Sequence, residues 1–299
     1  MLQYLNCQPA GVYVDTSVGD GGHAEAILNN LGSEGHLIGI DWDGDALQRT
    51  GERLKKHSRQ LKLVHADYTK LQVILSEAGF AEVDGILIDL GASTLQLMDA
   101  DRGFSIHHEG DLDMRMDRRR SLTAKEIVNH YSADQLAEVF FRFGEERFSR
   151  RIAARIVRER EKKDSINSSS ELAEIVKAAV PARYRRQGGH PARRVFQALR
   201  LAVNEELENI TTVLPQAVNS LAPEGRLAVI AYHSLEDRLV KQYFREISGH
   251  CSCPPNLPCN CRSQALVKVL TGKAVKPTTG EVDSNPRARS ARLRVAEKI

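Results

Sequence analysis

Four acidic side chains and a glycine-rich turn stand where a parallel sheet would bring them together. The turn Gly19-Asp-Gly-Gly22 follows an apolar run that ends at Asp15. Asp41, Asp67 and Asp89 each come at or just after the end of another apolar run. In doubly wound folds, ligands bind beyond the carboxyl ends of the strands. The spacing therefore predicts a small-molecule site built from this turn and these carboxylates.

Each part of the predicted site suits a different part of a nucleoside ligand. Asp41 is placed to accept hydrogen bonds from two ribose hydroxyls, and the ring of Tyr68 could lie against an adenine. Asp89 is expected near the reacting end of the ligand. The residues of the turn that lack a Cβ let the backbone approach a ligand closely; they are Gly19, Gly21 and Gly22.

Two cofactors fit this pattern. Gly19-x-Gly21-x-x-Ala24 followed by Asp41 also satisfies the fingerprint of a dinucleotide site. Asp15 favours S-adenosylmethionine, because an acidic residue before the turn can meet the ammonium group of that ligand through water or backbone. Ala66-Asp-Tyr68 favours it too, since this segment suits adenine recognition rather than a nicotinamide.

Strand-like and helix-like patterns alternate along the segments that carry these residues. The predicted strands cover 11–15, 36–40, 61–64 and 85–88, and the predicted helices cover 24–31, 45–57 and 71–78. Such alternation predicts a parallel sheet covered by helices on both faces. A fifth strand is expected at 226–232, after the turn 222–225.

A helical block interrupts this sheet. Helices are expected at 123–129, 132–143, 145–162 and 170–179, with Ser132 and Ser170 as N-caps. We therefore predict an α/β, Rossmann-like fold with a mostly parallel, doubly wound sheet and an inserted all-helical domain. Residues 1–104 and 201–299 would form the sheet domain, which ends in a basic tail rich in Cys, Pro and Arg. Residues 105–200 would form the insert, which we expect to bind RNA.

The charge of the chain is unevenly distributed. Residues 1–117 hold 9 basic and 19 acidic side chains, whereas residues 118–299 hold 33 and 20. This asymmetry indicates an acidic part with a small-molecule site and a basic part that faces a polyanion. Residues 181–200 contain six arginines and no acidic residue. The arginines that we expect to contact RNA are Arg185, Arg186, Arg193 and Arg194.

Several longer motifs resemble one known family. They are Asp15-Thr-Ser-Val-Gly-Asp-Gly-Gly-His23, Val83 to Ser93, Gly110-Asp-Leu-Asp-Met-Arg-Met-Asp117, Gly144-Glu-Glu-Arg-Phe148 and His233-Ser-Leu-Glu-Asp-Arg238. The chain resembles the ribosomal RNA small subunit methyltransferase H family from about Gly11 to Lys298. One departure is Ser93-Thr-Leu-Gln96, where Ser-Ser-Pro-Gln is usual.

The resemblance implies a class I methyltransferase that uses S-adenosyl-L-methionine. It implies methylation of N4 of a cytidine in the decoding region of 16S ribosomal RNA, within the small ribosomal subunit. By motif, the implied cofactor contacts are Gly21, Gly22, His23, Asp41, Tyr68, Asp89 and Gln96. Without the resemblance, Gln96 would be a simple loop residue.

Methylation of a cytosine amino group needs an oriented nucleophile. The lone pair of N4 is delocalised into the ring, so an oxygen that accepts from the amino hydrogens would help. The usual Asp/Asn/Ser-Pro-Pro-aromatic motif is absent here, since Asp89-Leu-Gly-Ala follows the fourth strand. The candidates are Asp89, Asp113, Asp117 and His233. Asp113 and Asp117 could instead pair with nearby arginines, and His233 could bond to backbone. Phe104 and Tyr232 could stack on the target base.

The rest of the sequence restricts the class of protein. No apolar run reaches the roughly 18 residues of a membrane span, and residues 1–11 do not resemble a secretory signal.

Four of the five cysteines lie at 251–261. They could be a zinc site or reduced thiols, and we predict no metal. A cytoplasmic protein is expected. A homodimer is compatible with the sequence but does not follow from it.

Three other functions remain open from the sequence. One is amino methylation of another RNA or of DNA. Another is a catalytically idle RNA-binding module, which would not bind S-adenosylmethionine. The third is an NAD-dependent oxidoreductase, against which the absence of a dehydrogenase-like proton donor pattern speaks.

Overall fold

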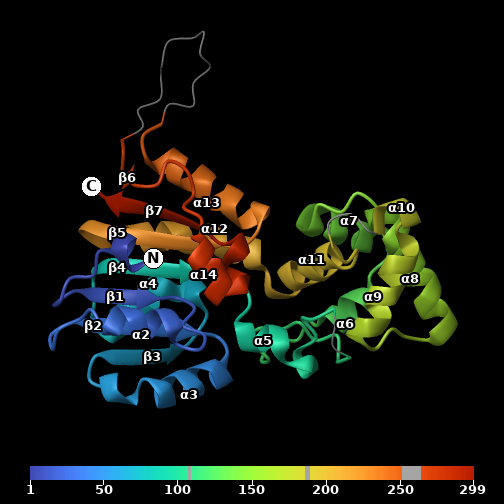
Figure 1. Cartoon of the computed structure of the whole chain (residues 1–299), viewed down its shortest axis with the longest axis horizontal. Coiled ribbons are helices and arrows are strands. Elements are labelled where there is room, and N and C mark those ends of the chain that lie inside the picture. Colours follow the sequence, from blue (N-terminus) through green and yellow to red (C-terminus); the bar gives the residue numbers. More distant parts are fainter. Residues whose placement is uncertain (107–108, 186–188, 251–263) are drawn as a thin grey trace, which may run out of the picture. The chain divides into compact units, whose positions relative to one another are not determined.

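The computed structural model describes residues 1–299 apart from 107–108, 186–188 and 251–263, and it divides into two compact units (Figure 1). Unit 1 comprises Met1–Gly91 and Leu207–Ile299, and unit 2 comprises Ala92–Glu206. Unit 2 extends beyond the predicted insert at both ends. Backbone and side-chain bonds explain this, because Met114 N donates to Arg102 O and Met116 N to Asn204 Oδ1.

Unit 1 contains a seven-stranded sheet in the order β3-β2-β1-β4-β5-β7-β6. The strands are β1 (Val12–Asp15), β2 (His36–Asp41), β3 (Leu61–His65), β4 (Val83–Asp89), β5 (Leu221–Ala231), β6 (Val267–Val269) and β7 (Arg292–Lys298). The first five pair in parallel, whereas β7 runs antiparallel to both β5 and β6. The predicted α/β, Rossmann-like fold with a mostly parallel, doubly wound sheet is confirmed.

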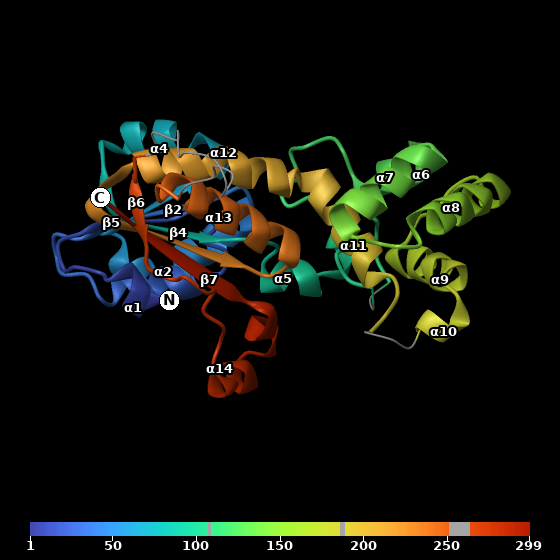
Figure 2. The same cartoon turned by 90° about the horizontal axis from the view of Figure 1, so that it is seen from above.

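Helices cover both faces of this sheet, as Figure 2 shows for α1 and α2 on one side and α4, α12 and α13 on the other. One face carries α1 (Leu2–Leu5), α2 (Gly22–Leu28) and α3 (Gly44–Arg53), and the other carries α4 (Leu71–Ala78), α12 (Glu206–Asn219) and α13 (Ser234–Ile247). Alternate strand residues enter the two cores: Tyr13 packs in one and Val14 in the other.

The last part of unit 1 departs from the prediction. The predicted turn 222–225 lies within β5, where Glu224 has φ 64° and the register against β4 shifts between Val83 and Gly85. The helix α13 and the strand β7 were not predicted. A short helix, α14 (Thr279–Ser284), precedes β7.

Unit 2 consists mainly of helices. They are α5 (Thr94–Met98), α6 (Ala124–His130), α7 (Ala133–Gly144), α8 (Ser149–Lys163), α9 (Ser169–Ala179), α10 (Ala182–Arg185) and α11 (Arg193–Asn204). The helix α7 packs against α8 and α11, and α8 packs against α9. Ser132 caps α7 as predicted, but Ser168 rather than Ser170 caps α9, since its Oγ accepts from Glu171 N.

Candidate active site

The carboxyl ends of the parallel strands bring three predicted carboxylates to one edge of the unit 1 sheet. Asp15, Asp41 and Asp89 end β1, β2 and β4. Asp15 interacts electrostatically with Asp41, Asp89 and His23. The sequence therefore located this cluster correctly, because strand ends of a parallel sheet share an edge.

The glycine turn between β1 and α2 is held in a shape that requires glycine. Gly19 and Gly21 have φ values of 50° and 79°, in the left-handed region that glycine adopts without a Cβ clash. A Cβ on Gly21 would also lie 3.0 Å from Thr50 Cγ2. Thr50 Oγ1 donates to Gly19 O at 2.7 Å, which ties the turn to α3.

Gly22 is the part of the turn that is open. It is exposed and begins α2, and a Cβ built on it would meet no atom within 4 Å. A ligand group could therefore approach the backbone here, beside the N-terminus of a helix. This open backbone fits the predicted cofactor contact of Gly22.

Asp41 holds the glycine turn. Its Oδ2 accepts from Gly19 N at 2.8 Å and its Oδ1 accepts from Asp43 N at 2.9 Å. Burial raises the pKa of Asp41 to about 6, although these backbone donors lower it. The predicted contact with ribose hydroxyls would use the remaining lone pairs of the same carboxylate.

Asp15 is the most deeply buried acid of the cluster. Burial raises its pKa to about 7, partly offset by the nearby His23 and by Ser17 N, which donates to Oδ1 at 3.2 Å. Within the described residues, its Oδ2 and the neighbouring Thr16 Oγ1 have no hydrogen-bond partner. A buried carboxyl oxygen without a donor favours a ligand that brings a cation or an N–H group.

The raised pKa of Asp15 gives an expected pH dependence of stability. The folded state keeps a proton on Asp15 between about pH 4 and pH 7, whereas the unfolded chain loses it. The contribution of Asp15 therefore destabilises the protein as pH rises through this window. Asp15→Asn removes this effect. The free energy of unfolding of the variant, relative to that of wild type, should therefore increase by on the order of 1–4 kcal/mol as the pH rises from 4 to 8.

Thermal unfolding of both proteins without cofactor, at several pH values, measures this gain. Asp84→Asn is a matched control, because Asp84 is exposed on the same sheet. A Tm difference between Asp15→Asn and wild type that stays constant with pH would show that Asp15 is ionised in the fold throughout.

Both the carboxylate and the backbone of Asp89 are fixed by contacts with neighbouring residues. Tyr232 Oη donates to Asp89 Oδ1 at 3.0 Å, and His23 Nε2 lies 3.5 Å from Asp89 Oδ2. The backbone is fixed by Ser17, whose Oγ donates to Asp89 O at 2.6 Å and accepts from Asp89 N at 3.1 Å. Burial lowers the pKa of His23, but the Asp89 carboxylate and Asp15 outweigh it and the pKa is raised overall.

The adenine end of the predicted site lies beyond β2 and β3. Tyr68 is buried, and its ring packs against Trp42 with centroids 5.3 Å apart. Asp67 accepts from Thr69 N at 2.8 Å and so caps a short turn. Sequence reasoning missed Trp42, although its position directly after Asp41 could have indicated it.

The remaining predicted residues have structural contacts of their own. In unit 2, Gln96 forms a capping box with Ser93, Asp113 pairs with Arg115 at 2.7 Å, and Asp117 pairs with Arg119 at 2.8 Å. In unit 1, His233 caps α13 and its Nε2 lies 3.1 Å from Glu236 Oε1. The pairing alternative for Asp113 and Asp117 is thus the one observed, and His233 faces its own helix. The pKa of Asp113 is lowered, since Arg115 outweighs burial.

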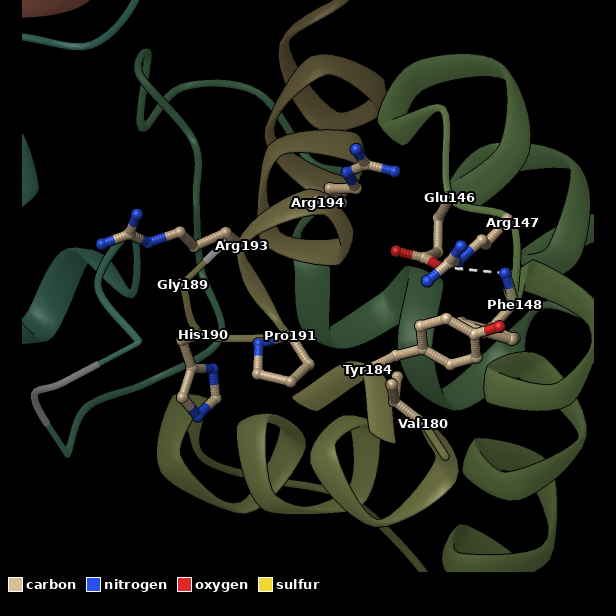
Figure 3. A pocket seen from close by; sticks show the side chains of 10 residues that line it. All are labelled: Glu146, Arg147, Phe148, Val180, Tyr184, Gly189, His190, Pro191, Arg193 and Arg194. Carbon is tan, nitrogen blue, oxygen red and sulfur yellow. Dashed lines mark hydrogen bonds between the residues drawn. The ribbon is translucent and has the colours of Figure 1, made fainter. Parts of the chain in front are cut away.

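Unit 2 contains a cavity of about 370 Å³ at the arginine-rich segment (Figure 3). It is lined by Glu146, Arg147, Phe148, Val180, Tyr184, Gly189, His190, Pro191, Arg193 and Arg194. The Arg147 guanidinium lies 3.8 Å from the centroid of the Tyr184 ring and 4.7 Å from that of Phe148. Predicted Arg193 and Arg194 therefore line the same cavity as this cluster of aromatic and cationic side chains.

The predicted arginines differ in their contacts. Arg185 Nε donates to Val180 O at 2.8 Å and so binds the C-terminal end of α9. Arg194 Nη1 donates to Glu145 O at 3.0 Å, while Arg193 is exposed at the start of α11. Arg186 lies outside the described residues, as do Cys251, Cys253, Cys259 and Cys261.

Among the residues that the structure describes, no group of three or more His, Cys, Asp or Glu side chains is arranged to hold a metal ion. No helix there has the length and apolar character needed to cross a membrane.

The similarity to known proteins extends over the whole chain. The model of a family described as the MraW methylase family matches residues 1–299. A ribosomal RNA small subunit methyltransferase H from Halothermothrix orenii is 47% identical over 299 residues, which cover 100% of this chain and 96% of that protein. Proteins of the same name from Brevibacillus brevis and Symbiobacterium thermophilum are 45% and 46% identical, over 100% of this chain and 95% and 94% of theirs.

Proposed function

This chain belongs to the MraW methylase family, and from that premise we propose that it methylates N4 of a cytidine in the decoding region of 16S ribosomal RNA. Its cofactor is S-adenosyl-L-methionine. Relatives that match its full length are named as methyltransferases of small-subunit ribosomal RNA. Membership in a methylase family removes the NAD-dependent oxidoreductase as an alternative.

The observation that carries the proposal is the acidic cluster at the open glycine turn. The cofactor has a cationic ammonium group and supplies a methyl group on a positively charged sulfur, which is a good leaving group. Asp15 offers a buried oxygen without a donor, and Gly22 offers an accessible backbone. Gly21, Gly22, His23 and Asp41 would hold the methionine and ribose portions. Tyr68, with Trp42 beside it, would border the adenine.

Asp89 is the residue that we assign to the target amino group. Its carboxylate accepts a hydrogen bond from one hydrogen of N4, which orients the nitrogen and concentrates its lone pair toward the methyl carbon. When N4 bonds to that carbon, the carbon–sulfur bond breaks and its electron pair stays on sulfur. The proton that N4 loses passes to the Asp89 carboxylate. Asp113, Asp117 and His233 act through the loops and the helix that they stabilise.

RNA contact is proposed for the arginine-rich part of unit 2. Arginine suits bidentate contacts with phosphate and stacking on bases, and Arg147 already lies over Tyr184. The base would leave its stack to reach a methyltransferase site. Arg193 and Arg194 begin α11, whose first backbone N–H groups also favour an anion.

We expect Arg183→Ala/Arg193→Ala to weaken RNA binding across sequences. Both side chains are exposed in unit 2, and each lost phosphate contact should flatten the log–log salt slope by roughly 0.7–0.9. Fluorescence titration of labelled 16S rRNA fragments over a range of salt concentrations measures the slope. The control Arg59→Ala/Lys62→Ala removes the same charge from exposed positions of unit 1. Equal slopes in wild type and the unit 2 variant would exclude these two phosphate contacts.

The proposed reaction is tested by its product. The protein is incubated with S-adenosylmethionine and unmethylated 16S rRNA, and the RNA is digested to nucleosides for mass spectrometry. N4-methylcytidine is the expected product. Methylated adenosine or uridine would contradict the proposal, and a protein that binds no S-adenosylmethionine would be the idle RNA-binding module.

A further inference from the structure

Tyr232 lies where the sequence suggested a stacking partner for the target base, but its hydroxyl has a different task. It directly follows β5, and its Oη donates to Asp89 Oδ1 at 3.0 Å. Its backbone N donates to Glu236 Oε2 at 2.8 Å, which fixes the start of the turn into α13. The ring packs against the core that contains Leu87 and Ile230. The hydroxyl is therefore presented to Asp89 from a fixed direction.

The phenol of Tyr232 can only donate in this contact. Burial, followed by the negative charge of Asp89, raises the pKa of Tyr232 well above its usual range. The other acids that act on it are Glu236 and Glu281, which have the same effect. Tyr232 thus keeps its proton at every physiological pH and offers it to the carboxylate.

Asp89 has two partners that compete for the direction of its carboxylate. Oδ1 accepts from Tyr232, whereas Oδ2 lies 3.5 Å from His23 Nε2, too far for a strong hydrogen bond. Rotation about the terminal bond of an aspartate is soft and roughly two-fold. Without the Tyr232 hydroxyl, the carboxylate could turn and close the gap to His23, since that imidazole is only partly buried.

We propose that Tyr232 is a positioning residue that fixes the rotation of the Asp89 carboxylate, so that Oδ2 stays at the long 3.5 Å contact with His23 Nε2 and remains accessible at the strand ends, instead of closing to a short hydrogen bond with His23. This rests on the proposed role of Asp89 toward the target amino group. It goes beyond that role by naming the residue that sets the direction of the acceptor oxygen. A stacking role alone would need only the ring of Tyr232.

Tyr232→Phe tests the proposal because it keeps the ring and removes the hydroxyl. The His23 ring is followed by NMR titration of the free protein, with His23→Gln identifying its signal. We expect the pKa of His23 to rise by about 0.5–1 unit, because the released carboxylate moves toward it. We also expect kcat for methyl transfer to 16S rRNA to fall about tenfold, as for loss of a hydrogen bond to a charged group. The KM for RNA should stay the same.

Tyr243→Phe is the matched control, since Tyr243 packs on the opposite face of the same sheet through α13. It should change neither the His23 titration nor kcat. An unchanged His23 titration in Tyr232→Phe, or an unchanged kcat, would overturn the positioning role. The titration needs no RNA, so it gives an answer on Asp89 even if the product proves not to be N4-methylcytidine.

Discussion

Asp89→Asn is expected to lower the rate of methyl transfer to 16S rRNA by about 10²–10³-fold, the loss typical of a residue that accepts a proton in the transition state. Asparagine has nearly the shape of aspartate, and its amide oxygen can still accept from Tyr232. Its NH₂ group would then replace the oxygen near His23 and repel an amino hydrogen of the substrate. Single-turnover kinetics at saturating cofactor and RNA measure the rate of this step.

The control for this variant is Asp84→Asn on the same strand. Asp84 lies at the other end of β4, where Oδ2 accepts from Val12 N at 2.7 Å. The rate of methyl transfer by Asp84→Asn should equal that of the wild type. A rate for Asp89→Asn within about threefold of wild type would remove Asp89 from the chemistry and leave it as a contact of the cofactor.

Asp41→Ala should weaken S-adenosylmethionine binding at least tenfold, which is about 1.4 kcal/mol. The carboxylate accepts from Gly19 N of the glycine turn and from Asp43 N at the start of α3, so the substitution leaves both backbone donors without this acceptor. Hydrogen bonds to a charged acceptor contribute about 1.5–3 kcal/mol each. The loss therefore acts on the shape of the glycine turn as well as on any ribose contact.

Calorimetric titration of the cofactor, with circular dichroism to show that the fold is retained, measures this loss. Asp45→Ala is the control, because Asp45 is exposed in the first turn of α3. If Asp41→Ala bound the cofactor as tightly as wild type, neither the turn nor the carboxylate would form part of the cofactor site.

The early part of unit 1 could be predicted because its signals are local. The strands β1, β2 and β4 are each a short apolar run that ends in an acid, and Gly19 and Gly21 mark a turn that glycine adopts readily. The cluster of Asp15, Asp41 and Asp89 then follows from parallel pairing alone. These residues needed no knowledge of distant contacts.

The strand β7 could not be predicted because its partners are far away in sequence. Its arginines resemble a basic tail, yet Arg292 and Arg294 both pair with Asp237 of α13, at 3.0 and 2.6 Å. The alternation of Leu293 and Val295 toward the core was hidden by these charges. Two of the arginines that make this segment basic therefore form ion pairs within the fold.

The Tyr232 hydroxyl illustrates the same limit within the site. It joins the ends of β4 and β5, and sequence alone does not show that these strands are neighbours with Asp89 beside Ile230. The helix α11 was obscured for another reason. Its first residues belong to an arginine-rich stretch, which favoured an RNA-binding interpretation. The helical spacing of the buried Val195, Phe196 and Leu199 was therefore not recognised.

The central claim is that this protein methylates one cytidine of the small-subunit RNA at N4. Small subunits from cells that lack the activity are incubated with the protein and S-adenosylmethionine, and the 16S rRNA is cleaved into defined oligonucleotides for mass mapping. The account predicts a single added methyl group, on N4 of one cytidine in the decoding region. A methyl group on carbon 5 of a cytidine, on another base, or spread over many sites would contradict it.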